Sequence, residues 1–140
     1  MRLFKWSKMH EAFIPEIDAE HRTMFRLGQE LQEAVVGGSQ SERLRPLLDS
    51  LLSAMEGHFS HEERMMHAAS YPAYLWHKEQ HDAVRKRLRQ FSDAVGRGEQ
   101  EAPEMLLEYF RDWLQGHTRL SDRMMAAYLR NRRRVQAAAS

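Results

Sequence analysis

Histidines and carboxylates recur in this chain at spacings that suit metal binding. His58 precedes Glu62 by four residues, and His77 precedes His81 by four. On an α-helix, side chains four apart lie within about 40° of one another, one turn along. Imidazole nitrogens and carboxylate oxygens are ligands for iron, zinc and manganese. Each pair could therefore hold one metal ion, or two neighbouring ions, from one face of a helix.

A third pair, His117 and Asp122, has a different spacing. These residues are five apart, which places them about 140° apart on a regular helix. Both can point to one interior only where the helix is locally wide. We therefore predict a π-type turn near His117–Asp122, and regular i to i+4 hydrogen bonding throughout 115–124 would count against Asp122 as a ligand.

Glycine and proline divide the chain into the elements that must position these side chains. An arm of about residues 1–17 precedes four periodic segments, at about 18–37, 43–68, 72–96 and 103–130. Asp18 is a candidate N-cap and Pro72 a candidate first helical residue, whereas Pro46 obscures the start of the second segment. No segment alternates at period two, and short connections imply antiparallel neighbours. The sequence predicts an all-α, up-down-up-down four-helix bundle in a single domain, 1–140.

Each segment places a histidine in its own apolar stripe, the set of positions three and four apart that faces the core. In the last segment the stripe reads Leu106, Phe110, Trp113, His117, Leu120 and Met124. Because alternate helices run in opposite directions, residues late in one helix face residues early in the next. The polar members of the stripes should therefore meet at one level of the core: His21, His58, Glu62, His77, His81, His117 and Asp122.

A single inward histidine is usually a hydrogen-bonded core residue, but seven polar side chains together need another explanation. Each unpaired buried polar group costs about 1–3 kcal/mol. Seven would cost on the order of 10 kcal/mol, comparable with the ~5–15 kcal/mol that stabilises a whole domain. A metal would satisfy them together. The residue types leave the metal open, since such sites also take Zn²⁺ or Mn²⁺.

Composition limits the classes of partner. The chain has 140 residues, a size that fits one domain, and no cysteine, which excludes disulfides and thiolate metal ligands. Its 21 basic and 20 acidic residues give a net charge of +1, so charge predicts no strong attraction to nucleic acid or a membrane surface. The N-terminus lacks the apolar stretch of a signal peptide, and no run approaches the ~20 apolar residues of a membrane span. We expect a cytoplasmic protein.

Segments spread over nearly the whole chain match one known pattern. They are Trp6, "IDAEH" (17–21), "HFSHEE" (58–63), Met66, "YP" (71–72), "HKEQH" (77–81) and "WLQGHTRLSD" (113–122). In these segments the chain resembles the hemerythrins, specifically the single-domain bacterial type (bacteriohemerythrin). The resemblance implies two iron ions (Fe²⁺ or Fe³⁺) joined by a bridging oxo or hydroxo group. It implies that His77, His81 and His117 hold one iron, that His21 and His58 hold the other, and that Glu62 and Asp122 bridge them.

The function that the resemblance implies is reversible O₂ binding. Counting those ligands gives six for the first iron and five for the second, so one position is open, where O₂ would bind as a peroxide. The role would be oxygen storage, delivery or scavenging by a monomer that is not an enzyme. An alternative is a sensor module for oxygen, nitric oxide or iron, although 140 residues leave no room for the usual fused signalling domain. Another is a di-iron enzyme that acts on peroxide or nitric oxide.

The family's oxygen pocket maps onto four residues of this chain: Phe59, Trp113, Leu114 and Thr118. Thr118 departs from the pattern, since the family usually has Ile there, and His10 stands where the family tends to have Tyr. The Thr118 hydroxyl could bond to the helix backbone four residues back, or contact a ligand. Our hypothesis is that it makes the pocket wetter and hastens autoxidation, which Thr118→Ile would reverse. His61 and His67 lie beside or off the ligand stripe, and we expect both on the surface.

Overall fold

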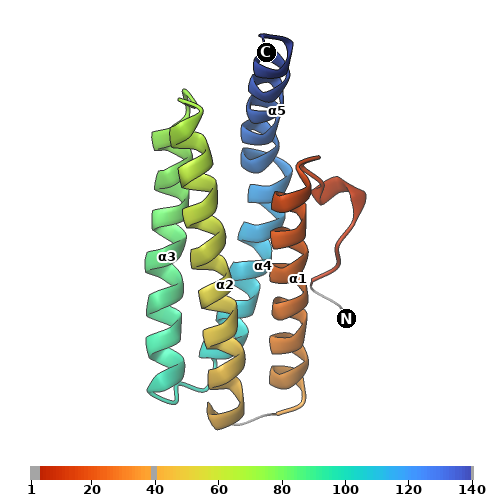
Figure 1. Ribbon diagram of the computed structural model, residues 1–140. Coiled ribbons are helices and arrows are strands. Elements are labelled where there is room, and N and C mark those ends of the chain that lie inside the picture. Colours follow the sequence, from red (N-terminus) through yellow and green to blue (C-terminus); the bar gives the residue numbers. More distant parts are fainter. Residues whose placement is uncertain (1–3, 39–40, 140) are drawn as a thin grey trace.

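Four antiparallel rods form the molecule, as the computed structural model shows for residues 4–38 and 41–139 (Figure 1). A short 3₁₀ turn, Lys8–His10, lies in the arm, of which residues 1–3 are outside the described part. The helices are α1 (Pro15–Val36), α2 (Ser41–Ala68), α3 (Tyr74–Gly96), α4 (Ala102–Arg119) and α5 (Ser121–Ala139). Helices α4 and α5 follow one another as the fourth rod. The described residues contain no strand, and the predicted all-α four-helix bundle is confirmed.

The start of α1 differs from the prediction, and the difference fixes the arm. The helix begins at Pro15, where a missing backbone N–H costs nothing because the first N–H groups have no intrahelical partner. Asp18 is therefore inside the first turn and is not the N-cap. Its buried carboxylate instead accepts hydrogen bonds from the backbone amides of Ala12 (2.7 Å) and Phe13 (3.1 Å). This contact ties the arm to the first turn of α1.

Two other helix starts and one end also differ from the prediction. Helix α2 begins at Ser41, so Pro46 lies in its second turn, and α3 begins at Tyr74, with Pro72 in the preceding turn. Helix α5 continues to Ala139, nine residues past the predicted end at 130. Its last turns project beyond the α2–α3 end of the bundle (Figure 1). None of the helices in the described ranges is both long and apolar enough to cross a membrane.

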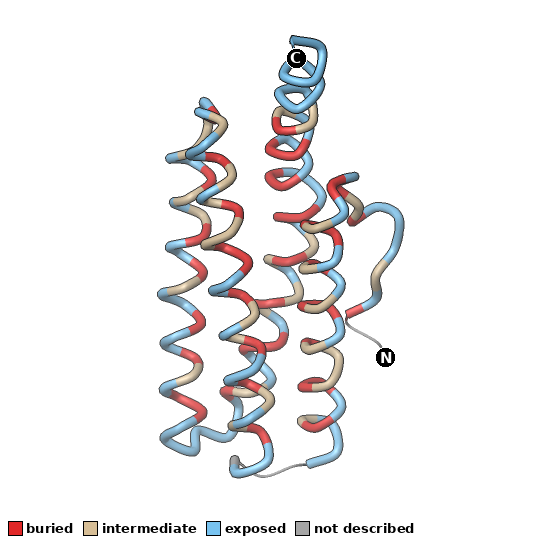
Figure 2. The backbone as a smooth tube through the Cα atoms, in the orientation of Figure 1, coloured by how far each residue is buried: buried red, intermediate tan, exposed pale blue. Residues whose placement is uncertain are grey.

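Buried residues form inward-facing stripes on every rod (Figure 2). They make two apolar clusters. The larger includes Phe25, Phe59, Val84 and Leu114, with other residues from all four rods and Phe4 from the arm. The smaller contains Ala12, Ile14, Ile17, Met66, Tyr71, Met125, Ala126 and Leu129. Apart from His58, which Phe59 of the larger cluster follows, the predicted metal-binding residues of each rod lie in sequence between the two clusters, so a polar layer separates two apolar ones.

A break at Leu120 turns the fourth rod between His117 and Asp122. Leu120 lies in a turn with φ −116° and ψ −71°, between the end of α4 and the start of α5. The predicted π-type turn is therefore wrong, although the predicted local irregularity is present. The break also moves the buried stripe, because Leu120 and Met124, predicted in the core, are 60% and 48% exposed. Beyond the break the stripe continues through Ser121, Asp122, Met125, Ala126 and Leu129.

Candidate metal centre

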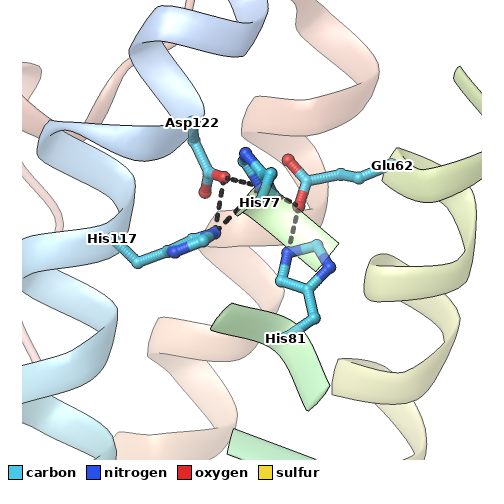
Figure 3. Close-up of side chains that lie close together, drawn as sticks. All are labelled: Glu62, His77, His81, His117 and Asp122. Atoms are coloured by element: carbon cyan, nitrogen blue, oxygen red, sulfur yellow. Dashed lines mark hydrogen bonds and ion pairs between the residues drawn. The ribbon is translucent and has the colours of Figure 1, made fainter. Parts of the chain in front are cut away.

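The structure brings all seven predicted ligand side chains together, and each of them is buried. Five of them form one group, in which the candidate ligand atoms all lie within 4.8 Å of one another: Glu62, His77, His81, His117 and Asp122 (Figure 3). A second group, by the same measure, contains His21, His58, Glu62 and Asp122. The two carboxylates thus belong to both groups, while each histidine belongs to one.

The two oxygens of Asp122 face different histidines. Its Oδ1 lies 2.8 Å from His117 Nε2 and 3.1 Å from His77 Nε2, whereas its Oδ2 lies 2.9 Å from His21 Nε2. Glu62 Oε1 lies 3.0 Å from His58 Nε2 and 3.3 Å from His81 Nε2. Both carboxylates therefore reach from the three-histidine group to the two-histidine group, which is the position of a bridging ligand.

The buried polar atoms suit cations better than they suit one another. The carboxylate oxygens of Glu62 and Asp122 make no well-directed hydrogen bond, although they lie close to the imidazoles. Within each group two Nε2 atoms face each other at 3.1 Å, His21 with His58 and His77 with His117, and such a pair can share only one proton. Two ligand atoms that each lie about 2.1 Å from one metal ion, in directions at right angles, would be about 3.0 Å apart. The nitrogen and oxygen atoms of this site have similar spacings. The donor set thus fits a pair of metal ions.

Three polar residues outside the seven orient the ligand rings. The Nδ1 of His58 lies 2.7 Å from Glu20, that of His81 lies 2.8 Å from Glu63, and that of His117 lies 3.0 Å from Gln80. Such outer partners fix the tautomer and the direction of a metal-binding imidazole. Sequence analysis missed these three residues, although each lies within one of the quoted segments. Their position directly next to a predicted ligand was the available signal.

Residues 12–129 match the family described as the Hemerythrin HHE cation binding domain. The chain belongs to the hemerythrin family. It is 31% identical to the bacteriohemerythrin of Aquifex aeolicus over 115 residues. The aligned region covers 81% of this chain and 87% of that protein. The bacteriohemerythrin of Ralstonia nicotianae is 28% identical over 132 residues, or 94% of this chain and 93% of that protein. The myohemerythrin of Theromyzon tessulatum is 26% identical over 119 residues, or 85% and 88%.

Without a metal, the charges of this hemerythrin site favour protonated imidazoles. Burial disfavours the charged form of His58, but the Glu62 charge and the hydrogen bond to Glu20 raise its pKa to about 10. Burial also opposes the charged form of His77, yet the carboxylates of Asp122 and Glu62 raise its pKa to about 9. The pKa values of Glu62 and Asp122 stay well below the ordinary range despite burial, because cationic imidazoles lie beside them.

We expect the metal-free chain to lose stability as the pH rises from about 7 to 10. The folded-state pKa values of His58 and His77 lie above 6.5, so the folded chain binds more protons than the unfolded chain. Their contribution is complete below pH 6.5 and is lost as the pH rises through about 9 and 10. Urea unfolding of the chain in the presence of a chelator, at pH values from about 7 to 10, measures this loss of unfolding free energy. Metal binding at pH 8 should also release about two protons per chain, because a ligand imidazole must be neutral.

The metal-loaded chain provides the control for this pH dependence. Its ligand imidazoles no longer carry the protons, so its unfolding free energy should stay nearly constant over the same range. A flat profile for the metal-free chain, or metal uptake without proton release in weakly buffered solution, would show that the imidazoles are already neutral.

Two aromatic rings cover the three-histidine side of the site. Phe59 stacks on His81 with ring centroids 4.1 Å apart, and Trp113 stacks on His117 at 4.5 Å. Phe59 and Trp113 also meet edge to face at 5.3 Å. Phe59 is buried and Trp113 is half-buried. These two of the four predicted pocket residues therefore lie against the rings of candidate ligands.

The two departures from the family pattern, His10 and Thr118, form one contact. The Thr118 hydroxyl donates a hydrogen bond to the carbonyl of Leu114 (2.7 Å), four residues back on the helix, which is one of the two predicted possibilities. It lies 3.1 Å from His10 Nδ1 and accepts the proton of that nitrogen, because its own proton is already donated. The His10 ring is buried against Phe25, at 4.7 Å between centroids. The hydroxyl is thus fully used by protein groups, and the effect of Thr118 on autoxidation stays a prediction.

We expect His10 and Thr118 to be coupled in stability. Thr118→Val leaves the buried His10 donor without a partner, and His10→Phe removes that donor, so each change should lower the unfolding free energy by about 1–2 kcal/mol. The double variant should lose about 1 kcal/mol less than the sum. Chemical unfolding of the four proteins measures the coupling. Strictly additive losses would mean that the contact contributes nothing.

The two remaining histidines differ in environment. His67 is exposed, as expected, and packs edge to face on Tyr74. His61 is only partly exposed, and its Nδ1 lies 2.8 Å from Glu20 Oε2. His61 therefore lies at the surface, as expected, but it also contacts the carboxylate that orients His58.

Proposed function

We propose that this chain is a non-haem di-iron protein that binds O₂ reversibly. The observation that carries the proposal is the unequal division of the histidines between two groups that share both carboxylates. In this assignment His77, His81 and His117 hold one iron, and His21 and His58 hold the other. Glu62 and Asp122 bridge the two ions. Relatives named bacteriohemerythrin, hemerythrin and myohemerythrin support the same reading.

The unequal ligand count explains why one small molecule would bind. If both carboxylates and one solvent-derived oxygen were shared, the three-histidine ion would have six ligands and the two-histidine ion five. Two ferrous ions held there would supply electrons and one open coordination position for O₂. That position would belong to the ion held by His21 of α1 and His58 of α2.

The chain's own residues favour binding over turnover. Phe59 and Trp113 stack on ligand rings and keep water from them. The Thr118 hydroxyl donates to Leu114 and accepts from His10, so it offers no free proton beside the site. Glu20, Glu63 and Gln80 hold three ligand rings in place. Fixed ligand rings, and a Thr118 hydroxyl whose proton is already donated, suit oxygen storage, delivery or scavenging better than an enzyme acting on peroxide or nitric oxide.

The test is the visible spectrum of the iron-loaded protein. The chain is reconstituted with Fe²⁺ without oxygen, exposed to air and then purged with argon. Reversible O₂ binding predicts an absorption band that appears in air, disappears under argon and returns on re-exposure. Irreversible oxidation on the first exposure would contradict reversible binding, and rapid consumption of added peroxide would instead support an enzyme.

A further inference from the structure

A surface hollow of about 480 Å³ lies outside the two-histidine side of the site, over α1 and α2. Glu20, His58, His61 and Arg64 contribute to its lining, with the small residue Gly57. A Cβ added at Gly57 would meet nothing within 4 Å, so this part of α2 leaves open space. The hollow is therefore a place where solvent comes close to a candidate metal ligand.

A chain of three polar groups runs from this hollow to the buried site. His61 Nδ1 lies 2.8 Å from Glu20 Oε2, and His58 Nδ1 lies 2.7 Å from Glu20 Oε1. The side chains of His61 and Glu20 are 29% and 32% exposed, whereas that of His58 is 1% exposed. One carboxylate thus contacts an accessible imidazole on one side and a buried ligand imidazole on the other.

The other sides of the site are less suited to a cation. On the α2–α3 side, the outer carboxylate Glu63 is already paired with Arg85 at 2.9 Å, whereas Arg64, which also lines the hollow, forms no ion pair with Glu20. On the α3–α4 side, the outer partner is the neutral Gln80. On the arm side, the Arg22 guanidinium lies over the Trp6 ring. In the described residues, no Lys or Arg nitrogen lies within 4.0 Å of the Glu20 carboxylate. Its ion-pair partners there are His58 and His61.

We propose that this hollow is the entry route by which divalent metal ions load the site, with Glu20 and His61 as the capture pair. Carboxylate and imidazole are suitable ligands for Fe²⁺ and related ions. A hydrated cation held between the Glu20 carboxylate and the His61 imidazole would lie directly outside His58. The inference depends on the proposed function only in requiring that the seven-residue site hold metal.

Loading kinetics test the route with a matched pair of variants. Metal-free protein is mixed with Co²⁺, and the visible absorbance of the bound ion is followed with time. His61→Lys places a positive charge at the hollow and removes the capturing nitrogen. His67→Lys makes the same charge change on the same helix, at an exposed residue outside the hollow. We expect His61→Lys to load about tenfold more slowly, and His67→Lys to load within about twofold of the unaltered chain. All should reach two ions per chain.

A neutral variant separates capture from repulsion. His61→Leu removes the nitrogen without adding charge and should also slow loading by at least about threefold. Equal loading rates for all variants, or slow loading only in His61→Lys, would overturn Glu20–His61 as a capture pair. A lower final Co²⁺ content with unchanged rate would also overturn it, because the pair would then hold the site and not the route. Circular dichroism of each variant confirms that it is folded. Failure of the unaltered chain to bind Co²⁺ would instead contradict the proposed function.

Discussion

Replacing Asp122 by Ala is expected to empty both halves of the metal site. The two Asp122 oxygens face different histidine groups, at 2.8 Å from His117 and 2.9 Å from His21. Its loss therefore removes a ligand from each ion, and leaves Glu62 as the one remaining carboxylate of both groups. Loss of an outer partner alone costs about 10–100-fold in metal affinity, so loss of a shared ligand should cost more. Iron content should fall from two per chain to well below one.

Asp112→Ala is the matched control for this prediction. Asp112 lies on the same rod as Asp122, but its side chain is 67% exposed. In the part of the chain that the structure describes, its carboxylate forms an ion pair with the neighbouring Arg111. This variant should retain the full metal content by elemental analysis. If Asp122→Ala kept one tightly bound iron per chain, the carboxylate would serve a single ion, and the bridging assignment would be wrong.

Removing the metal is expected to lower the midpoint of thermal unfolding by at least about 15 °C. A ligand at a thousand times its dissociation constant stabilises the folded state by about 4.1 kcal/mol, so two ions contribute on the order of 8 kcal/mol. For domains somewhat larger than this chain, 1 kcal/mol shifts the midpoint by about 2–4 °C. We expect the metal-free chain to stay folded at neutral pH, because protonated His58 and His77 would partly compensate the two buried carboxylates. Calorimetry with and without chelator measures the shift.

The Asp122→Ala variant again supplies the comparison. Because it should hold little metal, chelator should leave its unfolding midpoint nearly unchanged. A shift of only about 2 °C for the unaltered chain would mean that the seven polar side chains are satisfied without metal, since one pairing interaction of about 1 kcal/mol accounts for that much.

The helical architecture and the meeting of seven polar residues could be predicted because both follow from local spacing. Stripes at three and four residues define which face of each helix is buried, and short connections define the antiparallel order. The five-residue interval between His117 and Asp122 also indicated a local irregularity. The type of irregularity could not be predicted, because Leu120 is an ordinary helix-forming residue. A break in the helix and a wide turn would both satisfy the same spacing.

Contacts between distant segments could not be predicted, because no periodicity links them. His10 and Thr118 are 108 residues apart, and both were identified as departures without any sign that they touch. Asp18 has the residue type of an N-cap, but the structure uses its carboxylate to hold the arm. Glu20 lies next to a ligand in sequence, yet its contacts with His58 and His61 depend on how α1 packs on α2.

The most direct test is a crystal structure of the iron-loaded protein, with diffraction measured at the iron absorption edge. We expect two anomalous peaks inside the bundle. One should be enclosed by His77, His81 and His117, the other by His21 and His58, with Glu62 and Asp122 touching both. A single peak, no peak, or His21 or Asp122 turned away from the metal would contradict it.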